Sequence, residues 1–234
     1  MKILVLGHKG MLGHMVVGFL KKYYNVSTIS TRWPECKEKI LSFKGDYIIN
    51  CIGAIPQRTN NFDINWQLPI WLDENMDCKI IHPGTDCEMD ADKYGISKRM
   101  AADYIKTKGK QTKILKTSII GPELNGNSSL LEWFLSQKNE VYGYTEAMWN
   151  GNTTLEWSKQ CLNLIKNWDN YKTLTILEGE QISKYNMLNN IKKLFNVNTN
   201  IIPKKLGKNK TLKGEIKTPD FMNQLKELKN YYYD

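Results

Sequence analysis

Residues 1–16 read MKILVLGHKGMLGHMV, and this stretch decides the fold. A short apolar run over 2–6 leads into three glycines spaced as GxxGxxG, and an amphipathic stretch over 11–22 follows, which together predict a strand, a glycine turn and a helix. Gly7 permits the turn, Gly10 lets a pyrophosphate approach the backbone, and Gly13 lets the helix pack closely on the sheet. The positive end of the helix dipole adds attraction for phosphate. The stretch therefore predicts a dinucleotide site, with an ordinary strand-to-helix turn as the alternative.

The first 120 residues alternate short apolar runs with amphipathic stretches, which is typical of βαβ units in a parallel sheet. Further strands are expected over 26–30, 46–51, 78–82 and 112–116, and helices over 65–75 and 93–108. The second half predicts helices and short strands over 129–137, 153–167, 173–177, 183–195, 199–202 and 219–231, with a Lys- and Gly-rich loop over 203–218. We expect an α/β fold in which a Rossmann-type, doubly wound parallel sheet (1–120) carries a smaller C-terminal α/β substrate lobe (121–234), with segments free to interleave.

The composition narrows the class of protein. The chain has 234 residues and a formal net charge of +9, which raises nucleic acid as a partner. Its only arginines are Arg32, Arg58 and Arg99, and its lysines are spread along the chain, so the usual arginine base readers are nearly absent. No apolar run reaches the roughly 18–20 residues that cross a bilayer, and the five cysteines show no CxxC pair. We expect a reduced, cytoplasmic protein with no metal site, no membrane partner and no nucleic-acid partner.

The end of the second expected strand indicates which dinucleotide binds. An acidic residue there would bond the ribose 2′-hydroxyl of NAD, but this chain has Ser30, Thr31 and Arg32. A hydroxyl and a guanidinium suit the 2′-phosphate of NADP, and Lys9 in the glycine loop could add charge. The residues favour NADP, and a solvated loop residue is the alternative for Arg32.

A second motif, YGISK, carries the candidate chemistry. Tyr94 and Lys98 lie four residues apart on an expected helix and share a face. A tyrosine with a pKa of about 10 is a weak acid and base, and an ammonium beside it should lower that pKa. Tyr94 could protonate an oxygen that gains charge as hydride arrives, while Lys98 holds the nicotinamide ribose. Thr85, after the fourth expected strand, would bond the same oxygen. An ordinary surface pair is the alternative for Tyr94 and Lys98, and a turn or cap residue is the alternative for Thr85.

With these residues in this order, the chain resembles the extended short-chain dehydrogenases/reductases, specifically the dTDP-4-dehydrorhamnose reductase branch, which reduces nucleotide-linked 4-keto-6-deoxy sugars. The matching segments span the chain: GHKGMLG, YIINCIG, INWQLP with Asn65, GTDC, YGISK, KTSIIGPE, WNGNTTLEWSK and LKGEIKTPDFMNQLKEL. The resemblance implies that Thr85, Tyr94 and Lys98 form a catalytic triad. It implies a cofactor site lined by Gly7, Gly10, Met11, Leu12, Gly13, Arg32, Cys51, Ile52 and Gly53. It implies sugar-nucleotide contacts at Thr117, Ser118, Glu123, Trp149 and Asn150, although Trp149 is equally a candidate core residue.

Two features of the TDCEMDADKY segment stand apart. In relatives a long excursion separates the hydroxyl from the tyrosine, whereas Thr85 and Tyr94 are nine positions apart. The short loop leaves the site more open or requires another segment to cover it. In the related GDP-fucose synthase group, a cysteine two residues after the hydroxyl is an epimerase base, which implies the same role for Cys87. A small buried residue is the alternative for this cysteine.

The expected function is therefore an NADPH-dependent reductase of a nucleotide-diphosphate 4-keto-6-deoxyhexose, of the rhamnose type or its N-acetylamino counterpart, with epimerisation before reduction and a homodimer both left open. A non-catalytic NADP-binding regulatory subunit with the same fold is the second hypothesis. A nucleic-acid-binding protein that uses the positive charge is the third.

Overall fold

The computed structural model describes residues 1–234 and divides them into two compact units. The first unit comprises Met1–Lys116 and Ser158–Thr175, and the second comprises Thr117–Trp157 and Ile176–Asp234. The expected division after residue 120 lies close to Lys116, after which the chain first passes from one unit to the other. The chain then returns to the first unit before it completes the second, so the two units interleave.

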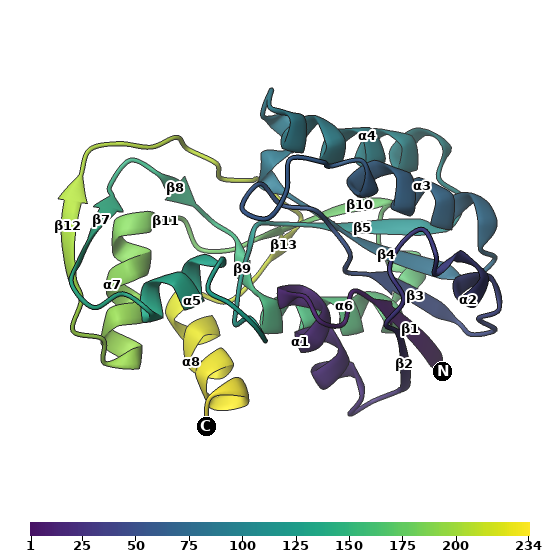
Figure 1. Cartoon of the computed structure of the whole chain (residues 1–234), viewed down its shortest axis with the longest axis horizontal. Helices are drawn as coiled ribbons and strands as arrows, with labels where there is room; N and C mark the ends of the chain where they lie inside the picture. The colour runs from purple at the N-terminus through teal and green to yellow at the C-terminus, as the bar shows by residue number, and fades with distance from the viewer. The chain divides into compact units, whose positions relative to one another are not determined.

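A seven-stranded parallel sheet of the Rossmann type forms the centre of the fold (Figure 1). Its order is β13-β10-β5-β4-β3-β1-β2. The strands are β1 (Lys2–Leu6), β2 (Asn25–Ile29), β3 (Tyr47–Asn50), β4 (Lys79–Gly84), β5 (Thr112–Lys116), β10 (Leu174–Glu178) and β13 (Ile216–Lys217). The predicted fold class, a doubly wound α/β sheet with a smaller C-terminal α/β region, is confirmed.

The topology places a switch point beside β1. This strand pairs in parallel with β2 on one side and with β3 on the other, so Leu6 is opposite both Ile29 and Asn50. The chain runs outward from β1 to β2 and then crosses back to β3. Connections that leave in opposite directions open a crevice at the carboxyl ends of the strands. The glycine loop after β1 and the turn after β3 both begin at this edge.

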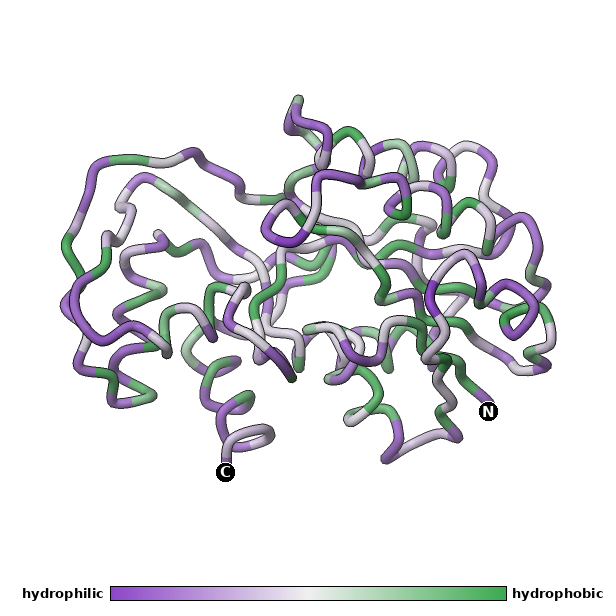
Figure 2. The backbone as a smooth tube through the Cα atoms, viewed as in Figure 1, coloured by the Kyte–Doolittle hydropathy of each residue, from purple (hydrophilic) through white to green (hydrophobic).

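Helices cover both faces of the first unit's sheet (Figure 1). The helices α3 (Ile64–Asn75) and α4 (Lys93–Lys108) lie on one face, and α1 (Met11–Leu20) and α6 (Thr154–Lys166) lie on the other. The central strands are consequently buried on both sides: Ile48 and Ile49 of β3 are fully buried. Figure 2 shows the resulting hydrophobic stretches along the strands.

Two details of the helices differ from expectation. Pro69 is expected near a first turn, but α3 begins at Ile64, so Pro69 lies in its interior, where its ring removes one helical hydrogen bond. Leu68 and Leu72 are fully buried on either side of it, and their packing offsets that loss. The short helix α2 (Lys37–Leu41) was not expected, because five residues give no readable periodicity.

The second unit is built around a two-stranded parallel pair, β7 (Glu140–Tyr144) with β12 (Asn200–Lys204). Its helices are α5 (Leu130–Leu135), α7 (Lys184–Phe195) and α8 (Phe221–Tyr232), and its shorter strands are β6 (Ile119–Ile120), β8 (Met148–Trp149), β9 (Asn152–Thr153) and β11 (Ile182–Ser183). Strand β7 was not expected, because Gly143 lies within it and weakens its strand signal. None of the helices in either unit has the length and apolar character that a membrane span requires.

We predict that Gly13→Ala lowers the free energy of unfolding by about 1–3 kcal/mol. A Cβ at Gly13 would lie 2.1 Å from the Gly7 carbonyl oxygen, so the glycine loop or α1 must shift. Gly10→Ala is the matched control, since its Cβ meets only the same oxygen at an ordinary 3.4 Å. Urea denaturation of both variants checks this, and equal stability of the two would contradict the packing role of Gly13.

Candidate active site

The glycine loop rests directly on the turn that follows β3. Gly7 has a φ of +78°, and a Cβ on it would lie 2.8 Å from the carbonyl carbon and oxygen of Cys51. The Gly10 N–H donates to the Gly7 carbonyl at 2.9 Å and closes the turn. Gly10 itself is not required by internal packing, so its missing side chain leaves room at the start of α1. The loop therefore fits a pyrophosphate that approaches the helix N-terminus.

Cationic side chains follow the end of β2. The Lys39 ammonium donates to the Thr31 hydroxyl at 2.7 Å, and both Arg32 and Lys39 are exposed to solvent. Lys9 in the glycine loop is also exposed. Sequence reasoning identified Thr31, Arg32 and Lys9 but missed Lys39, because the short helix that carries it was not expected. This set of residues fits a 2′-phosphate better than a bare ribose hydroxyl.

A buried pair fixes the Cys51-Ile52-Gly53 turn. The Asn50 side chain accepts from the Ile52 N–H at 3.1 Å and donates to Nδ1 of His82 at 3.2 Å. Burial, followed by the charge of Lys98, holds the pKa of His82 well below its usual value, so the ring is neutral and its Nδ1 can accept. Sequence analysis placed His82 in a strand and gave it no role.

Thr85 begins a short 3-10 helix, η1 (Asp86–Met89), as its N-cap. Its hydroxyl accepts from the Cys87 N–H at 3.3 Å and donates to Asp86 at 3.0 Å. The Glu88 carboxylate accepts from the Thr85 N–H at 3.0 Å, which completes a capping box. Thr85 is therefore a cap residue, which is the alternative that the sequence left open for it. Hydrogen bonds within residues 85–88 fix its position.

Tyr94 lies in the first turn of α4, where the Thr85 hydroxyl acts on its phenol. The ring of Phe62 packs edge-on against it, with centroids 5.7 Å apart. Burial raises the pKa of Tyr94 to about 12, the neighbouring Cys87 adds to this, and Thr85 opposes it. The expected lowering of this pKa is therefore wrong: burial dominates, and the Lys98 ammonium donates instead to the Pro83 carbonyl at 3.1 Å.

Lys98 lies one helical turn beyond Tyr94 and is 7% exposed. Burial lowers its pKa to about 8, and Glu88 opposes the shift. At pH 7 the ammonium is still mostly charged. Tyr94 and Lys98 thus lie one turn apart on α4, and the catalytic triad with Thr85 stays a prediction.

Asn65 connects the turn after β3 to the tyrosine helix. Its amide accepts from the Ala54 N–H at 2.7 Å and donates to the Ala54 carbonyl at 3.0 Å and to Ser97 Oγ at 3.1 Å. Ser97 in turn donates to the Tyr94 carbonyl at 2.7 Å. The predicted segment INWQLP therefore contributes an amide that fixes both sides of the site.

Cys87 is half-buried, two residues after Thr85. Its thiol donates to the Asp86 carboxylate, with the two atoms 3.5 Å apart. A carboxylate that accepts from a thiol favours the protonated sulfur over the thiolate. The arrangement therefore opposes, rather than assists, a role as a base.

The residues implied for substrate contacts belong to the second unit. The Asn150 amide donates to the Leu212 carbonyl at 2.7 Å and accepts from the Leu212 N–H at 2.8 Å. Trp149 is 6% exposed and packs edge-on against Phe221. Thr117 accepts from Asn152 at 2.9 Å. The remaining two are partly exposed: Ser118, and Glu123, which accepts from the N–H groups of Ser128 and Ser129. Trp149 thus has the packing of a core residue.

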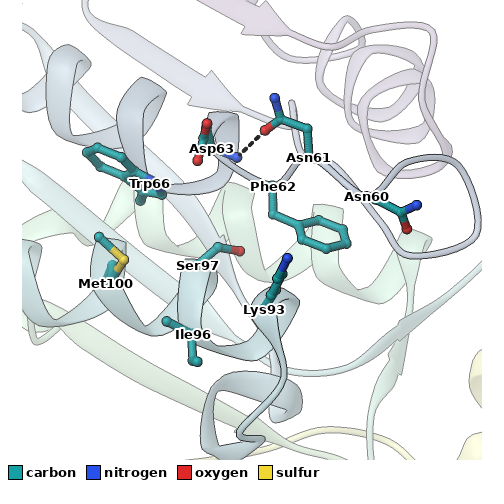
Figure 3. Close-up of a pocket in the computed structure, with 9 residues that line it drawn as sticks. All are labelled: Asn60, Asn61, Phe62, Asp63, Trp66, Lys93, Ile96, Ser97 and Met100. Carbon is teal, nitrogen blue, oxygen red and sulfur yellow. Dashed lines mark hydrogen bonds between the residues drawn. The ribbon is translucent and has the colours of Figure 1, made fainter.

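A pocket of about 400 Å³ opens between the N-terminal halves of α3 and α4 (Figure 3). Phe62, which contacts Tyr94, forms part of its wall. The other lining residues are Asn60, Asn61, Asp63, Trp66, Lys93, Ile96, Ser97 and Met100. Sequence reasoning assigned no role to these residues, because nothing in their spacing shows that the two helix ends lie together.

The chain has the fold of the NAD(P)-dependent, sugar-nucleotide-modifying extended short-chain dehydrogenases/reductases. The dTDP-4-dehydrorhamnose reductase of Bacillus anthracis, in complex with NADP, superposes with a TM-score of 0.75 at 13% identity, over 97% of this chain and 98% of that one. The dTDP-4-dehydrorhamnose reductase of Clostridium acetobutylicum gives 0.74 at 17% identity, over the whole of both chains.

The same fold also occurs in enzymes with other chemistry. The dTDP-glucose 4,6-dehydratase of Bacillus anthracis, in complex with NAD, gives a TM-score of 0.74 at 14% identity, over 100% of this chain and 96% of that one. No family model matches the chain, and no curated protein matches it. The comparisons therefore establish the fold, and the function must be argued from the site.

We predict that Lys98→Met is more stable than the wild type at pH 7, by up to about 3 kcal/mol. The buried ammonium has a pKa of about 8, below its usual 10.5, so its charge destabilises the fold below pH 8. Between these two values the unfolded chain binds more protons than the folded one, and the wild type regains stability as the pH rises. Denaturation at pH 7 and pH 10 should show the advantage shrinking. A constant difference would contradict this.

Proposed function

We propose that this protein is an NADPH-dependent reductase of a nucleotide-diphosphate 4-keto-6-deoxyhexose. The observation that carries the proposal is the placement of Thr85, fixed by its capping box after β4, ahead of Tyr94 and Lys98 on α4, in a fold whose glycine loop fits a dinucleotide. A bound reduced nicotinamide would supply hydride to the sugar C4. This chain's own residues supply the proton and hold the carbonyl oxygen.

The proton donor in this proposal is Tyr94. Its pKa of about 12 keeps the phenol protonated at neutral pH, which is the form that a reduction requires. Thr85 would turn its one hydroxyl proton from Asp86 to the same carbonyl oxygen and so orient it. Once Tyr94 has given its proton, the Thr85 hydroxyl would turn to the phenolate, which it favours. Lys98, charged at pH 7, would bond the cofactor ribose and favour the phenolate electrostatically.

NADP is the proposed cofactor because of the basic residues after β2. Arg32 and Lys39 supply two exposed cations, and Thr31 accepts from Lys39, where an NAD-specific site would carry an acidic residue. Gly7, Gly10, Met11, Leu12 and Gly13 would hold the pyrophosphate, and the Cys51-Ile52-Gly53 turn would line the opposite side of the crevice.

The substrate class rests on the resemblance and on the shared fold. The structures with this fold include two dTDP-4-dehydrorhamnose reductases and a GDP-mannoheptose C4 reductase of Campylobacter jejuni with NADP bound. Ser118 and Glu123 are the implied substrate residues that keep partly exposed side chains. Thr117, Trp149 and Asn150 would act mainly by shaping the second unit.

The direct experiment is NADPH oxidation against a panel of dTDP-, UDP- and GDP-linked 4-keto-6-deoxy sugars, with the products identified by NMR. The proposal expects one or more substrates to be reduced at C4. Cofactor binding without turnover of any 4-keto sugar would instead favour the non-catalytic NADP-binding subunit. The same spectra would reveal inversion at C3 or C5, which the hydrogen bond from Cys87 to Asp86 disfavours.

We predict that Tyr94→Phe lowers kcat by about 10²–10⁴-fold, because the variant loses its proton donor. The affinity for NADPH, measured by fluorescence titration, should change little. Tyr104→Phe is the matched control on the same helix, since its hydroxyl bonds Glu74 at 2.9 Å and takes no part in the proposed site. Full activity in Tyr94→Phe would exclude the mechanism.

We predict that Arg32→Ala weakens NADPH binding by about tenfold or more and leaves NADH binding nearly unchanged, because only NADPH carries the 2′-phosphate. Lys44→Ala removes an equal charge from an exposed position between α2 and β3 and serves as the control. Calorimetric titration with both cofactors checks this. An equal loss for NADH and NADPH would mean that Arg32 does not read the phosphate.

A further inference from the structure

Glu88 is a buried carboxylate in the short loop between Thr85 and Tyr94, and it is 4% exposed. Each of its carboxylate oxygens has a separate partner. Oε1 accepts from the Thr85 N–H at 3.0 Å, and Oε2 accepts from the Lys116 ammonium at 2.6 Å. A buried ion pair of this kind contributes little net stability compared with apolar residues of the same size. Its presence beside the proposed triad therefore suggests a role in the chemistry.

The surroundings are shaped to admit this carboxylate. A Cβ on Gly84, the last residue of β4, would lie 2.9 Å from the Lys116 Cβ and 3.0 Å from Glu88 Oε1. Arg99 on α4 donates to the Glu88 carbonyl at 3.1 Å. Glu88 is therefore connected to β5 through Lys116, to the tyrosine helix through Arg99, and to Thr85 through the capping box.

The charged groups around Lys98 show what Glu88 contributes. On β4, His82 is buried and neutral, and the Pro83 carbonyl accepts from the Lys98 ammonium. On β5, Lys116 adds a second positive charge. Tyr94, on the helix of Lys98 itself, is a neutral phenol at pH 7 because its pKa is raised to about 12. On η1, Cys87, Asp86 and Glu88 all act on Tyr94, and Glu88 alone of the three also acts on Lys98, where its negative charge opposes the loss of a proton.

We propose that Glu88 is a positioning residue that holds the Thr85 backbone in place and balances the charge of the buried Lys98 ammonium. The catalytic meaning of this role rests on the proposed function. The electrostatic part does not, because the protonation of Lys98 can be measured without substrate. In this proposal the short loop has a role, because it places a carboxylate three residues after Thr85.

The decisive measurement is the titration of Lys98 followed by the ¹³Cε chemical shift of labelled lysine, with Lys98→Met used to assign the signal. In Glu88→Gln the midpoint should fall by about one pH unit, because the opposing charge is gone. Asp86→Asn is the matched control: it removes a carboxylate from the same 3-10 helix that acts on Tyr94 but not on Lys98. The control should leave the Lys98 midpoint in place.

Activity provides a second readout once a substrate is known. Glutamine keeps an oxygen that can accept from Thr85, so Glu88→Gln should retain its plateau kcat/KM while the basic limb of the pH profile moves downward with the Lys98 midpoint. Glu88→Ala should lose the plateau as well, because it also releases Thr85. If Glu88→Gln instead lowers kcat/KM equally at every pH and leaves the basic limb of the pH profile in place, Glu88 has only a structural role.

An unchanged Lys98 midpoint in folded Glu88→Gln would overturn the inference, even if the wild type reduces a 4-keto sugar. Conversely, a wild type without reductase activity would defeat the proposed function while the lysine titration still decides the role of Glu88. If Glu88→Gln does not fold, Lys116→Met replaces it. This variant removes the ion-pair partner of Glu88, so the carboxylate should act more strongly on Lys98 and raise its midpoint. A fall or no change would contradict the inference.

Discussion

The structure depends on one close backbone contact, in which the glycine loop after β1 rests against the turn after β3. Gly7 comes so near to Cys51 that a single added carbon would clash, and Gly13 comes nearer still to Gly7. Because β1 and β3 are neighbours at the switch point, this contact holds the glycine loop against the next turn at the strand ends, where ligands bind in sheets of this kind. The buried pair of Asn50 and His82 then fixes the turn after β3.

The proposed chemistry is assembled at the next strand by local means. Thr85 is oriented by the capping box that begins directly after β4, and Tyr94 enters in the first turn of α4. In this proposed active site, burial raises the pKa of the Tyr94 phenol and lowers the pKa of the Lys98 ammonium. Opposite shifts in an acid and its neighbour are frequent at functional sites, where the fold accepts a loss of stability.

The sequence predicted the parallel sheet well, because strands buried on both faces read as short apolar runs separated by amphipathic helices. It also placed Tyr94 and Lys98 on one helix, because their spacing needs only one helix, while their roles and that of Thr85 stay predictions. It missed β7, in which Gly143 lies, and α2, which is too short to show a period. It gave the wrong direction for the pKa of Tyr94 and no role to Glu88, because burial and partners across strands are not visible in spacing alone.

The central claim is that hydride passes to the C4 carbon of a sugar nucleotide while Tyr94 gives the proton. The most direct test uses NADPH deuterated at nicotinamide C4 on each face in turn, with a 4-keto-6-deoxy sugar nucleotide that the protein accepts. The account predicts deuterium at C4 of the hexose from one of the two cofactors and none from the other. Oxidation of NADPH that leaves no deuterium in the sugar from either cofactor would contradict it.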